Sequence, residues 1–182
     1  MTRLDHVALL VPDLARASDA VRALGLAVAP ARDFPGEGTR EAYVGPDDAA
    51  ARLLLVSPLG PGPYARALER RGPGLHHVAL ATPDPRALAE AATGWLLHPR
   101  SLRSWEKGRT LWLARPGVGT LVEVTEEATP LACGAAVVDG VELPGATAAL
   151  LAALAVDGLR PSPDDRAWLG LAGRRVRADG PW

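Results

Sequence analysis

Two histidines lie at equivalent positions of an internal repeat, and imidazoles are common metal ligands and general acid–base groups. Residues 5–13 read DHVALLVPD and residues 76–84 read HHVALATPD. His6 and His77 each open a His-Val-Ala-Leu segment, 71 residues apart (77 − 6 = 71). If the two repeats pack with quasi-twofold symmetry, the two imidazoles converge. Because strand side chains alternate between faces, we expect His76 to be exposed or to act only on a neighbouring ligand. His98 is given no role.

A single carboxylate interrupts the last apolar strand of the second repeat. Residues 119–124 read GTLVEV, and Glu123 is the only charged residue among them. A charged group that faces a core is costly unless it is paired or bound to a metal. The alternation of side chains does not decide whether Glu123 faces the interior or solvent, so both alternatives stay open.

Each repeat predicts a strand, a helix and further strands. The opening segments alternate as strands do, and each ends at Pro-Asp, which is typical of a helix start. Helical spacing follows in both copies, and strand-like segments come after the helices. The unit is therefore β-α-β-β, with one more strand that the sequence does not place. The later strands are expected at 39–44 and 52–56 in the first copy, and at 110–114 and 119–125 in the second.

The remaining segments are a linker and a C-terminal third. The linker predicts a short helix at 64–71. The last third predicts a strand at 134–138, a helix at 146–156 and a hairpin that turns at Gly173. This β-α-β-β extension is a degenerate half-module, a dimerisation arm or a lid. The expected division is a first module at 1–58, the linker at 59–74, a second module at 75–126 and the extension at 127–182.

Length and composition favour a globular protein with one domain, or one domain and an appendage. The chain has 182 residues, of which 48% are hydrophobic and 23% charged, and its net charge is −1. We expect neither nucleic acid nor membrane as a partner. Cys133 is the single cysteine, which excludes an intrachain disulfide and a zinc site of several thiolates. The first residues do not form a signal peptide, so a cytoplasmic protein is expected.

Several motifs resemble the vicinal oxygen chelate superfamily, which includes glyoxalase I, methylmalonyl-CoA epimerase, extradiol dioxygenases and antibiotic-sequestering proteins. The epimerases are the most similar in pattern. The motifs are LDHVA at 4–8, PLG at 58–60, ALERRG at 67–72 running into GLHHVA at 74–79, GR at 108–109 and GTLVEV at 119–124. The resemblance covers roughly residues 3–126. It implies an α+β fold in which two paired βαβββ modules form a half-open sheet cleft, here followed by the β-α-β-β extension.

The resemblance also implies a divalent metal at the floor of that cleft. Carried over residue by residue, the ligands are His6, His77 and Glu123, with Co, Mn, Fe, Ni or Zn as candidate ions. The fourth family position falls at Leu54, which cannot ligate a metal. Two histidines and one carboxylate still suffice for Fe(II), Mn(II) or Co(II), with open positions for water or substrate. Glu41 and Tyr43 are alternatives for a fourth ligand.

Glu41 aligns where some epimerases carry a catalytic acid/base glutamate, and Glu123 is a second candidate acid/base group. The resemblance thus predicts an isomerase or lyase that moves a proton next to a metal-bound carbonyl of a small acid or acyl-CoA. An Fe(II) dioxygenase and a non-catalytic small-ligand binder are the alternatives, and a homodimer is left open. For CoA phosphates, the candidates are Arg40, Arg70, Arg71, Arg103 and Arg109. Trp95, Trp105 and Trp112 could wall an apolar pocket.

Overall fold

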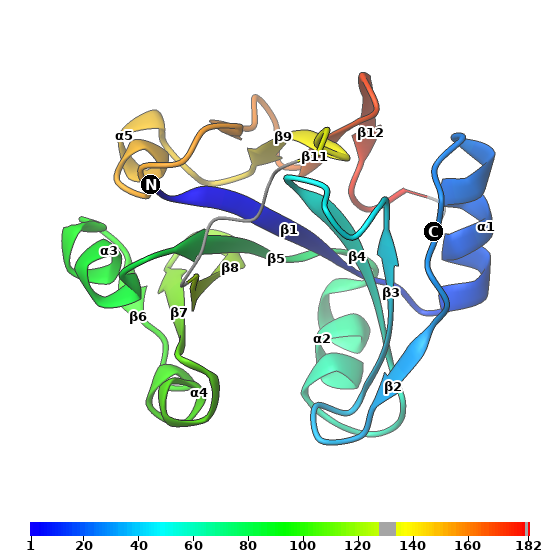
Figure 1. Ribbon diagram of the computed structural model, residues 1–182, viewed down its shortest axis with the longest axis horizontal. Helices are drawn as coiled ribbons and strands as arrows, with labels where there is room; N and C mark the ends of the chain where they lie inside the picture. The colour runs from blue at the N-terminus through cyan, green and yellow to red at the C-terminus, as the bar shows by residue number, and fades with distance from the viewer. Residues whose placement is uncertain (128–133, 181) are drawn as a thin grey trace.

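Both repeats contribute to one eight-stranded sheet. The computed structural model describes residues 1–127, 134–180 and 182, so Cys133 lies outside the described residues. Strand order in the sheet is β2-β3-β4-β1-β5-β8-β7-β6, in which each half mirrors the other. β1 and β5 are antiparallel neighbours at its centre. The two paired βαβββ modules expected from the sequence are confirmed, including the third strand that the sequence did not place (Figure 1).

The elements of the two modules follow one another in the same order. The first module comprises β1 (Arg3–Leu10), α1 (Leu14–Ala23), β2 (Arg32–Phe34), β3 (Thr39–Val44) and β4 (Arg52–Pro58). The linker helix is α2 (Pro63–Arg71). The second module comprises β5 (Gly74–Thr82), α3 (Pro85–Ala91), β6 (Leu96–Leu97), α4 (Ser101–Gly108), β7 (Thr110–Arg115) and β8 (Val118–Glu126). The sequence did not predict α4.

Capping explains where the two equivalent helices begin. The Asp13 carboxylate accepts a hydrogen bond from the Arg16 amide, and the Asp84 carboxylate accepts from the Arg86 and Ala87 amides. These contacts satisfy amide groups that have no partner inside the helix. The Pro-Asp signal at the end of each opening strand therefore sets the same strand-to-helix turn in both modules.

The two faces of the sheet differ in what covers them. Figure 1 shows the sheet as an arch, with α2 and α4 below it and the C-terminal strands above it. The upper, convex face contributes most of the hydrophobic core, including Val7, Leu9 and Leu80. Ala8 and Leu10, on the other face of β1, pack in a second, smaller cluster with α2. The concave face between α2 and α4 is thus left available for a cavity.

The C-terminal extension forms a separate four-stranded sheet against the convex face. Its elements are β9 (Val138–Leu143), α5 (Ala148–Ala152), β10 (Leu159–Pro161), β11 (Trp168–Leu171) and β12 (Arg174–Arg177), with strand order β10-β9-β11-β12. The amides of Val137 and Val138 donate to the Ala51 carbonyl, which ties the extension to the first module. Among the described residues, no helix combines the length and apolar character that a membrane span needs.

The hairpin predicted in the extension is confirmed. The first strand of the extension, however, was predicted in the wrong place. The strand expected at 134–138 instead runs from Val138 to Leu143. Its polar residues obscure the pattern, because only Val138, Val141 and Leu143 are buried in it. The helix is shorter than the expected 146–156, and β10 was not predicted. The extension is therefore β-α-β-β-β.

We expect Gly145→Ala to destabilise the protein by about 1–3 kcal/mol more than Gly173→Ala, which is the usual cost of overpacking. Both glycines have left-handed backbones, with φ of 72° and 75°. A Cβ at Gly145 would lie 2.1 Å from the Gly117 carbonyl oxygen, whereas one at Gly173 would meet nothing within 4 Å. Urea denaturation measures the difference. Equal losses of stability would show that the extension does not pack closely on the turn between β7 and β8.

Candidate metal centre

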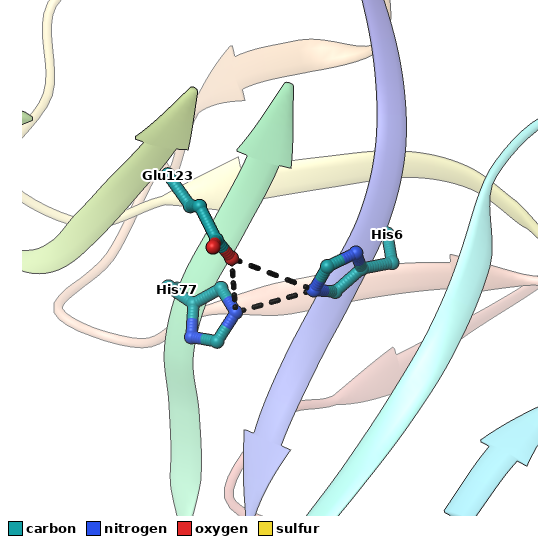
Figure 2. Close-up of side chains that lie close together, drawn as sticks. All are labelled: His6, His77 and Glu123. Atoms are coloured by element: carbon teal, nitrogen blue, oxygen red, sulfur yellow. Dashed lines mark hydrogen bonds and ion pairs between the residues drawn. The ribbon is translucent and has the colours of Figure 1, made fainter. Parts of the chain in front are cut away.

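Three side chains from three strands meet on the concave face of the sheet. His6 Nε2 lies 3.3 Å from His77 Nε2 and 3.8 Å from Glu123 Oε2, and His77 Nε2 lies 3.3 Å from the same oxygen. Figure 2 shows them pointing at one another from β1, β5 and β8. The parallel pairing of β5 and β8 places Glu123 beside Ala79, two residue pairs along from His77 and therefore on the same face of the sheet. The structure therefore brings together the three residues that the sequence singled out.

The chemistry and spacing of this cluster fit a divalent metal. The cluster formed by His6, His77 and Glu123 offers one ligand atom per residue, all within 4.8 Å of one another. The nearest point equidistant from those three atoms lies in their plane, about 2 Å from each, close to the usual bond lengths of nitrogen and carboxylate ligands to zinc-sized ions. The side chain of Glu123 is 18% exposed, so this carboxylate faces the cavity instead of bulk solvent.

A β-bulge places a carboxylate behind His6. Leu4 pairs with Leu80 and His6 pairs with Ala79, so Asp5 is an extra residue on β1. Bulges re-aim side chains and are common beside active sites. The Asp5 carboxylate lies 2.8 Å from His6 Nδ1. Because a carboxylate only accepts, the proton belongs on Nδ1 and the Nε2 lone pair faces the cluster.

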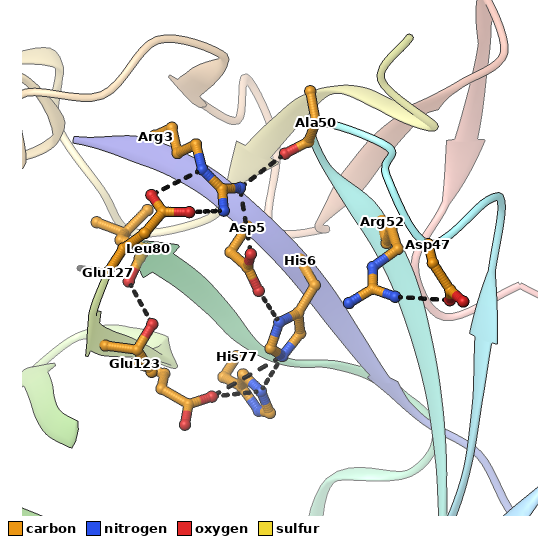
Figure 3. A network of polar contacts seen from close by, with 11 residues as sticks. Arg3, Asp5, His6, Asp47, Ala50, Arg52, His77, Leu80, Glu123 and Glu127 are labelled. Atoms are coloured by element: carbon orange, nitrogen blue, oxygen red, sulfur yellow. Dashed lines mark hydrogen bonds and ion pairs between the residues drawn. The ribbon is translucent and has the colours of Figure 1, made fainter. Parts of the chain in front are cut away.

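The Asp5 carboxylate is itself held by an arginine. Burial works to raise the pKa of Asp5, but the hydrogen bond with His6 and the positive charges of Arg3 and Arg52 outweigh burial and lower it. Arg3 lies 3.2 Å from Asp5 and also binds the Glu127 carboxylate (Figure 3). This chain of contacts keeps Asp5 ionised and fixes the orientation of the His6 ring. The sequence reasoning missed Asp5, although it directly precedes the repeated histidine.

A second bulge, on β5, places another imidazole behind His77. Ala8 pairs with His77 and Leu9 pairs with Leu75, so His76 is the extra residue. His76 Nδ1 lies 2.9 Å from His77 Nδ1, and the His76 ring stacks on Tyr64 of α2. Of the two alternatives expected for His76, exposure is wrong, because the bulge turns two consecutive residues inward and buries both. His76 instead contacts a candidate ligand.

Burial keeps both of these histidines neutral. It lowers the pKa of His76 to about 3, with further contributions from His77 and from two arginines. Burial also lowers the pKa of His77, against the opposing effect of Glu123. With the His77 proton on Nδ1, a neutral His76 accepts it and the Nε2 lone pair is left for a metal ion, whereas with the proton on Nε2 the His77 ring donates to Glu123. For Glu123, burial opposes ionisation, but the hydrogen bond with His77 and nearby positive charge lower its pKa. The cluster thus offers the neutral imidazole of His77, the Nε2 atom of His6 and a carboxylate.

We expect Asp5→Ala to weaken binding of a divalent metal by about 10–100-fold, the usual effect of removing the partner of a ligating histidine. Asp5→Asn should lose less, because its amide oxygen can still accept from His6. Isothermal titration with Mn²⁺ or Zn²⁺ measures both. The matched control is Asp47→Ala, which removes the same charge from a fully exposed side chain that lies 3.4 Å from Arg52. Equal affinity in Asp5→Ala and the control would contradict a role for Asp5.

The cluster lies at the bottom of a cavity of about 710 Å³. Glu41 and Tyr43 of β3 and Leu54 of β4 line it together with the three clustered residues. The Thr39 hydroxyl donates to Glu41 at 2.7 Å. Burial raises the pKa of Glu41 despite that hydrogen bond, and burial raises the pKa of Tyr43 to about 12. Leu54 is 4% exposed and presents an apolar side chain at the position where the resemblance predicted a fourth ligand to fall.

The arginines proposed for phosphate binding are dispersed. Arg103 lines the cavity. Arg40 pairs with Asp33, Arg109 pairs with Glu126, and Arg71 donates to the Gly119 carbonyl. Arg70 is exposed on α2. The sequence reasoning missed Arg100, which also lines the cavity.

The three tryptophans do not form one wall. Trp112 lines the cavity, and its ring meets His77 edge-on with 5.2 Å between centroids. Trp95 donates to the Leu150 carbonyl of the extension. The guanidinium carbons of Arg86 and Arg109 lie 4.5 Å and 4.7 Å from the centroid of the Trp105 ring. Only Trp112 of the three therefore belongs to the candidate site.

Comparison with protein families finds a match over most of the two modules. The Glyoxalase-like domain family matches residues 4–127, which is more than half of the chain. Among curated protein sequences, none matches.

Solved structures share the fold of the two modules. Methylmalonyl-CoA epimerase from Mycobacterium tuberculosis is 28% identical, with a TM-score of 0.55, over 69% of this chain and 88% of that one. A variant of the Streptomyces coelicolor epimerase in complex with 2-nitronate-propionyl-CoA is 26% identical, with a TM-score of 0.56, over 71% and 99%. A hypothetical protein from Bacillus halodurans is 21% identical, with a TM-score of 0.58, over 71% and 96%. This last similarity concerns the fold alone.

Proposed function

Because the chain belongs to the glyoxalase-like domain family, within the vicinal oxygen chelate superfamily and close to the methylmalonyl-CoA epimerases, we propose that it is a metal-dependent enzyme of proton transfer. The reaction moves a proton next to a carbonyl group of a small acid or acyl-CoA. The observation that carries the proposal is the convergence of His6, His77 and Glu123 in the cavity that Glu41 also lines.

The proposed roles follow from the chemistry of carbon acids. A divalent metal held by His6, His77 and Glu123 would supply positive charge where negative charge develops on the carbonyl oxygen. Glu41 takes the proton from the neighbouring carbon, since its carboxylate faces the same cavity. Its raised pKa makes it a stronger base than an ordinary glutamate. Glu123 is the proposed second acid/base group, through its oxygen that does not face the histidines.

The neighbouring structures support an acyl-CoA as the first substrate to test. Structures of methylmalonyl-CoA epimerases hold 2-nitronate-propionyl-CoA in one case, and methylmalonyl-CoA with NH4+ in another. Both structures are 26% identical to this chain. That this chain also acts on an acyl-CoA is our proposal.

Deuterium wash-in tests the reaction type. The metal-loaded protein is incubated in D2O with 2-methyl acyl-CoA esters and, separately, with the corresponding free acids. Exchange of the proton next to the carbonyl, followed by NMR, supports the proposed proton transfer. No exchange with any of these compounds, in a protein that binds metal, would reject this substrate class.

A second function is favoured by the position of Leu54. Two histidines and one carboxylate without a fourth protein ligand are typical of Fe(II) oxygenases. In this structure Leu54 is buried and lines the cavity where a fourth ligand would be expected. Oxygen uptake by the Fe(II)-loaded protein with catechols tests this alternative. Oxygen consumption together with absent proton exchange would favour the oxygenase.

We expect Leu54→Glu to bind a divalent metal more tightly than the wild type, because the new carboxylate enters the cavity beside the three existing ligands. A gain of about tenfold or more is expected, since one charge-assisted contact of about 1.5 kcal/mol corresponds to a factor of ten. Titration with Mn²⁺ measures the gain. Leu54→Gln is the uncharged counterpart and should gain less. Weaker binding in Leu54→Glu would show that this side chain is directed away from the metal.

A further inference from the structure

An ion pair crosses the cavity between the two modules. Arg100 Nη2 lies 2.6 Å from Glu37 Oε2. Glu37 lies in the turn between β2 and β3 of the first module, and Arg100 precedes α4 of the second. Both residues line the same cavity as the His6, His77 and Glu123 cluster. Any ligand that reaches the cluster therefore enters a cavity whose wall carries this pair.

The guanidinium group of Arg100 is positioned by an aromatic side chain of the cavity wall. Its guanidinium carbon lies 4.9 Å from the centroid of the Trp112 indole, which also meets His77. Stacking of this kind orients a guanidinium group while leaving its edge free for hydrogen bonds. The side chains of Arg100 and Glu37 are 35% and 55% exposed, so both can be reached from solvent.

Among the charged side chains that line the cavity, Arg100 is the main group that can attract an anion to the cluster. Glu37, Glu41 and Glu123 line the cavity, and among the described lining residues the arginines are Arg100 and Arg103. The positive charge of Arg100 acts on Glu123, His77 and His76. An anion close to Arg100 would therefore lie within the electrostatic reach of the cluster.

We propose that Arg100 is the residue that recognises an anionic oxygen group of the ligand, a carboxylate or a phosphate, and that Glu37 occupies its place until the ligand arrives. The inference rests on the proposed function and adds to it that the substrates are anions held by Arg100. Exposed ion pairs contribute little to stability, so a ligand can replace Glu37 at low cost. The planar guanidinium then binds the incoming group through two parallel hydrogen bonds.

Glu37 also screens the cavity against neutral and cationic compounds. A neutral ligand does not compete for Arg100 and leaves the pair in place. A cation is attracted to Glu37 but meets Arg100 beside it. Removal of Glu37 should therefore strengthen anion binding, whereas removal of Arg100 should weaken it. Opposite effects of two neighbouring substitutions distinguish this exchange from a purely structural ion pair.

The test uses the whole 182-residue chain, with and without Mn²⁺, and isothermal titration with malonate, inorganic phosphate and neutral malonamide. We expect Arg100→Gln to weaken anion binding at least tenfold and Glu37→Gln to strengthen it about three- to tenfold, with little binding of malonamide by any form. Arg100→Lys keeps the charge without the planar fork and should fall between the wild type and Arg100→Gln. Tighter binding of malonate than phosphate identifies a carboxylate ligand, and the reverse identifies a phosphate.

Arg175 of β12 and Glu142 of β9 provide a matched control. They form an ion pair of 2.7 Å in the C-terminal extension that does not line the cavity. Arg175→Gln and Glu142→Gln make the same changes in net charge and should leave anion binding unchanged. Similar affinities in the Arg100 and control variants, with folding verified by circular dichroism, would overturn the inference.

The outcome is independent of the proton-transfer assay. If the anion affinities change in opposite directions but no proton exchange occurs in any metal-loaded sample, the recognition of anions stands and the proposed reaction fails. If proton exchange occurs while Arg100→Gln and Glu37→Gln bind anions like the wild type, the reaction stands and the role of Arg100 fails.

Discussion

His77→Ala is expected to lower the affinity for a divalent metal more than a hundred-fold. The imidazole supplies one of three candidate ligands, and its Nε2 lies 3.3 Å from both His6 Nε2 and Glu123 Oε2. Loss of a partner behind a ligand already costs about 10–100-fold, so loss of the ligand itself should cost more. Elemental analysis of the purified protein and titration with Mn²⁺ or Zn²⁺ measure the change.

His98→Ala is the matched control for that experiment. His98 lies outside the cluster and accepts a hydrogen bond from the Arg100 amide. It should bind metal like the wild type. If His77→Ala retains wild-type affinity and a native circular dichroism spectrum, the assignment of the metal centre is wrong. A non-catalytic small-ligand binder then becomes the better interpretation of the protein.

Glu41→Gln is expected to slow proton exchange by about 100- to 10,000-fold, the usual contribution of a general base. The amide keeps the shape of the side chain and can still accept from the Thr39 hydroxyl, but it cannot take up the substrate proton. Metal affinity should stay within about twofold of the wild type, because Glu41 lies outside the three-residue cluster. Deuterium wash-in and metal titration on the same preparation separate the two effects. Loss of metal together with activity would instead assign Glu41 as a ligand.

The pH dependence of wild-type exchange follows from the same residue. Burial raises the pKa of Glu41 above that of an ordinary glutamate. Because the ionised form is the base, exchange should be present above this raised pKa and should fall as the pH drops through it. The acid limb should therefore lie at a higher pH than the value of about 4.3 for an unperturbed glutamate. In Glu41→Gln the limb should be absent.

The repeat and its symmetry could be predicted from the sequence because they rest on local patterns. The two His-Val-Ala-Leu segments alternate clearly, and Pro-Asp marks both helix starts. These signals placed His6 and His77 on paired strands. Glu123 followed from a charge in an apolar strand together with the family resemblance.

The residues behind the histidines could not be predicted from alternation. A bulge shifts every following side chain by one position, so the strict alternation assumed for His76 fails where β5 is irregular, and Asp5, which was given no role, occupies the corresponding bulge on β1. Each bulged residue directly precedes its histidine, and this shared position in the repeat was the available signal.

The contact between Arg100 and Glu37 has no local signal at all. The two residues are 63 positions apart and meet only because the modules pair across the cavity. The helix that Arg100 precedes was itself not predicted. Sequence periodicity predicts single helices and strands well. Which residues of the two modules meet across the cavity depends on the packing of the whole sheet.

The central position of β1 and β5 has a consequence for how an ion would leave the protein. Both strands are hydrogen-bonded on each side, in the middle of an eight-stranded sheet. Fraying begins at terminal strands such as β2 and β6, far from the two imidazoles in strand order. Backbone opening around His6 and His77 therefore requires most of the sheet to come apart. Ion exchange in the native protein should instead proceed through the solvent-facing mouth, at a rate set by side-chain motion and hydration and not by unfolding.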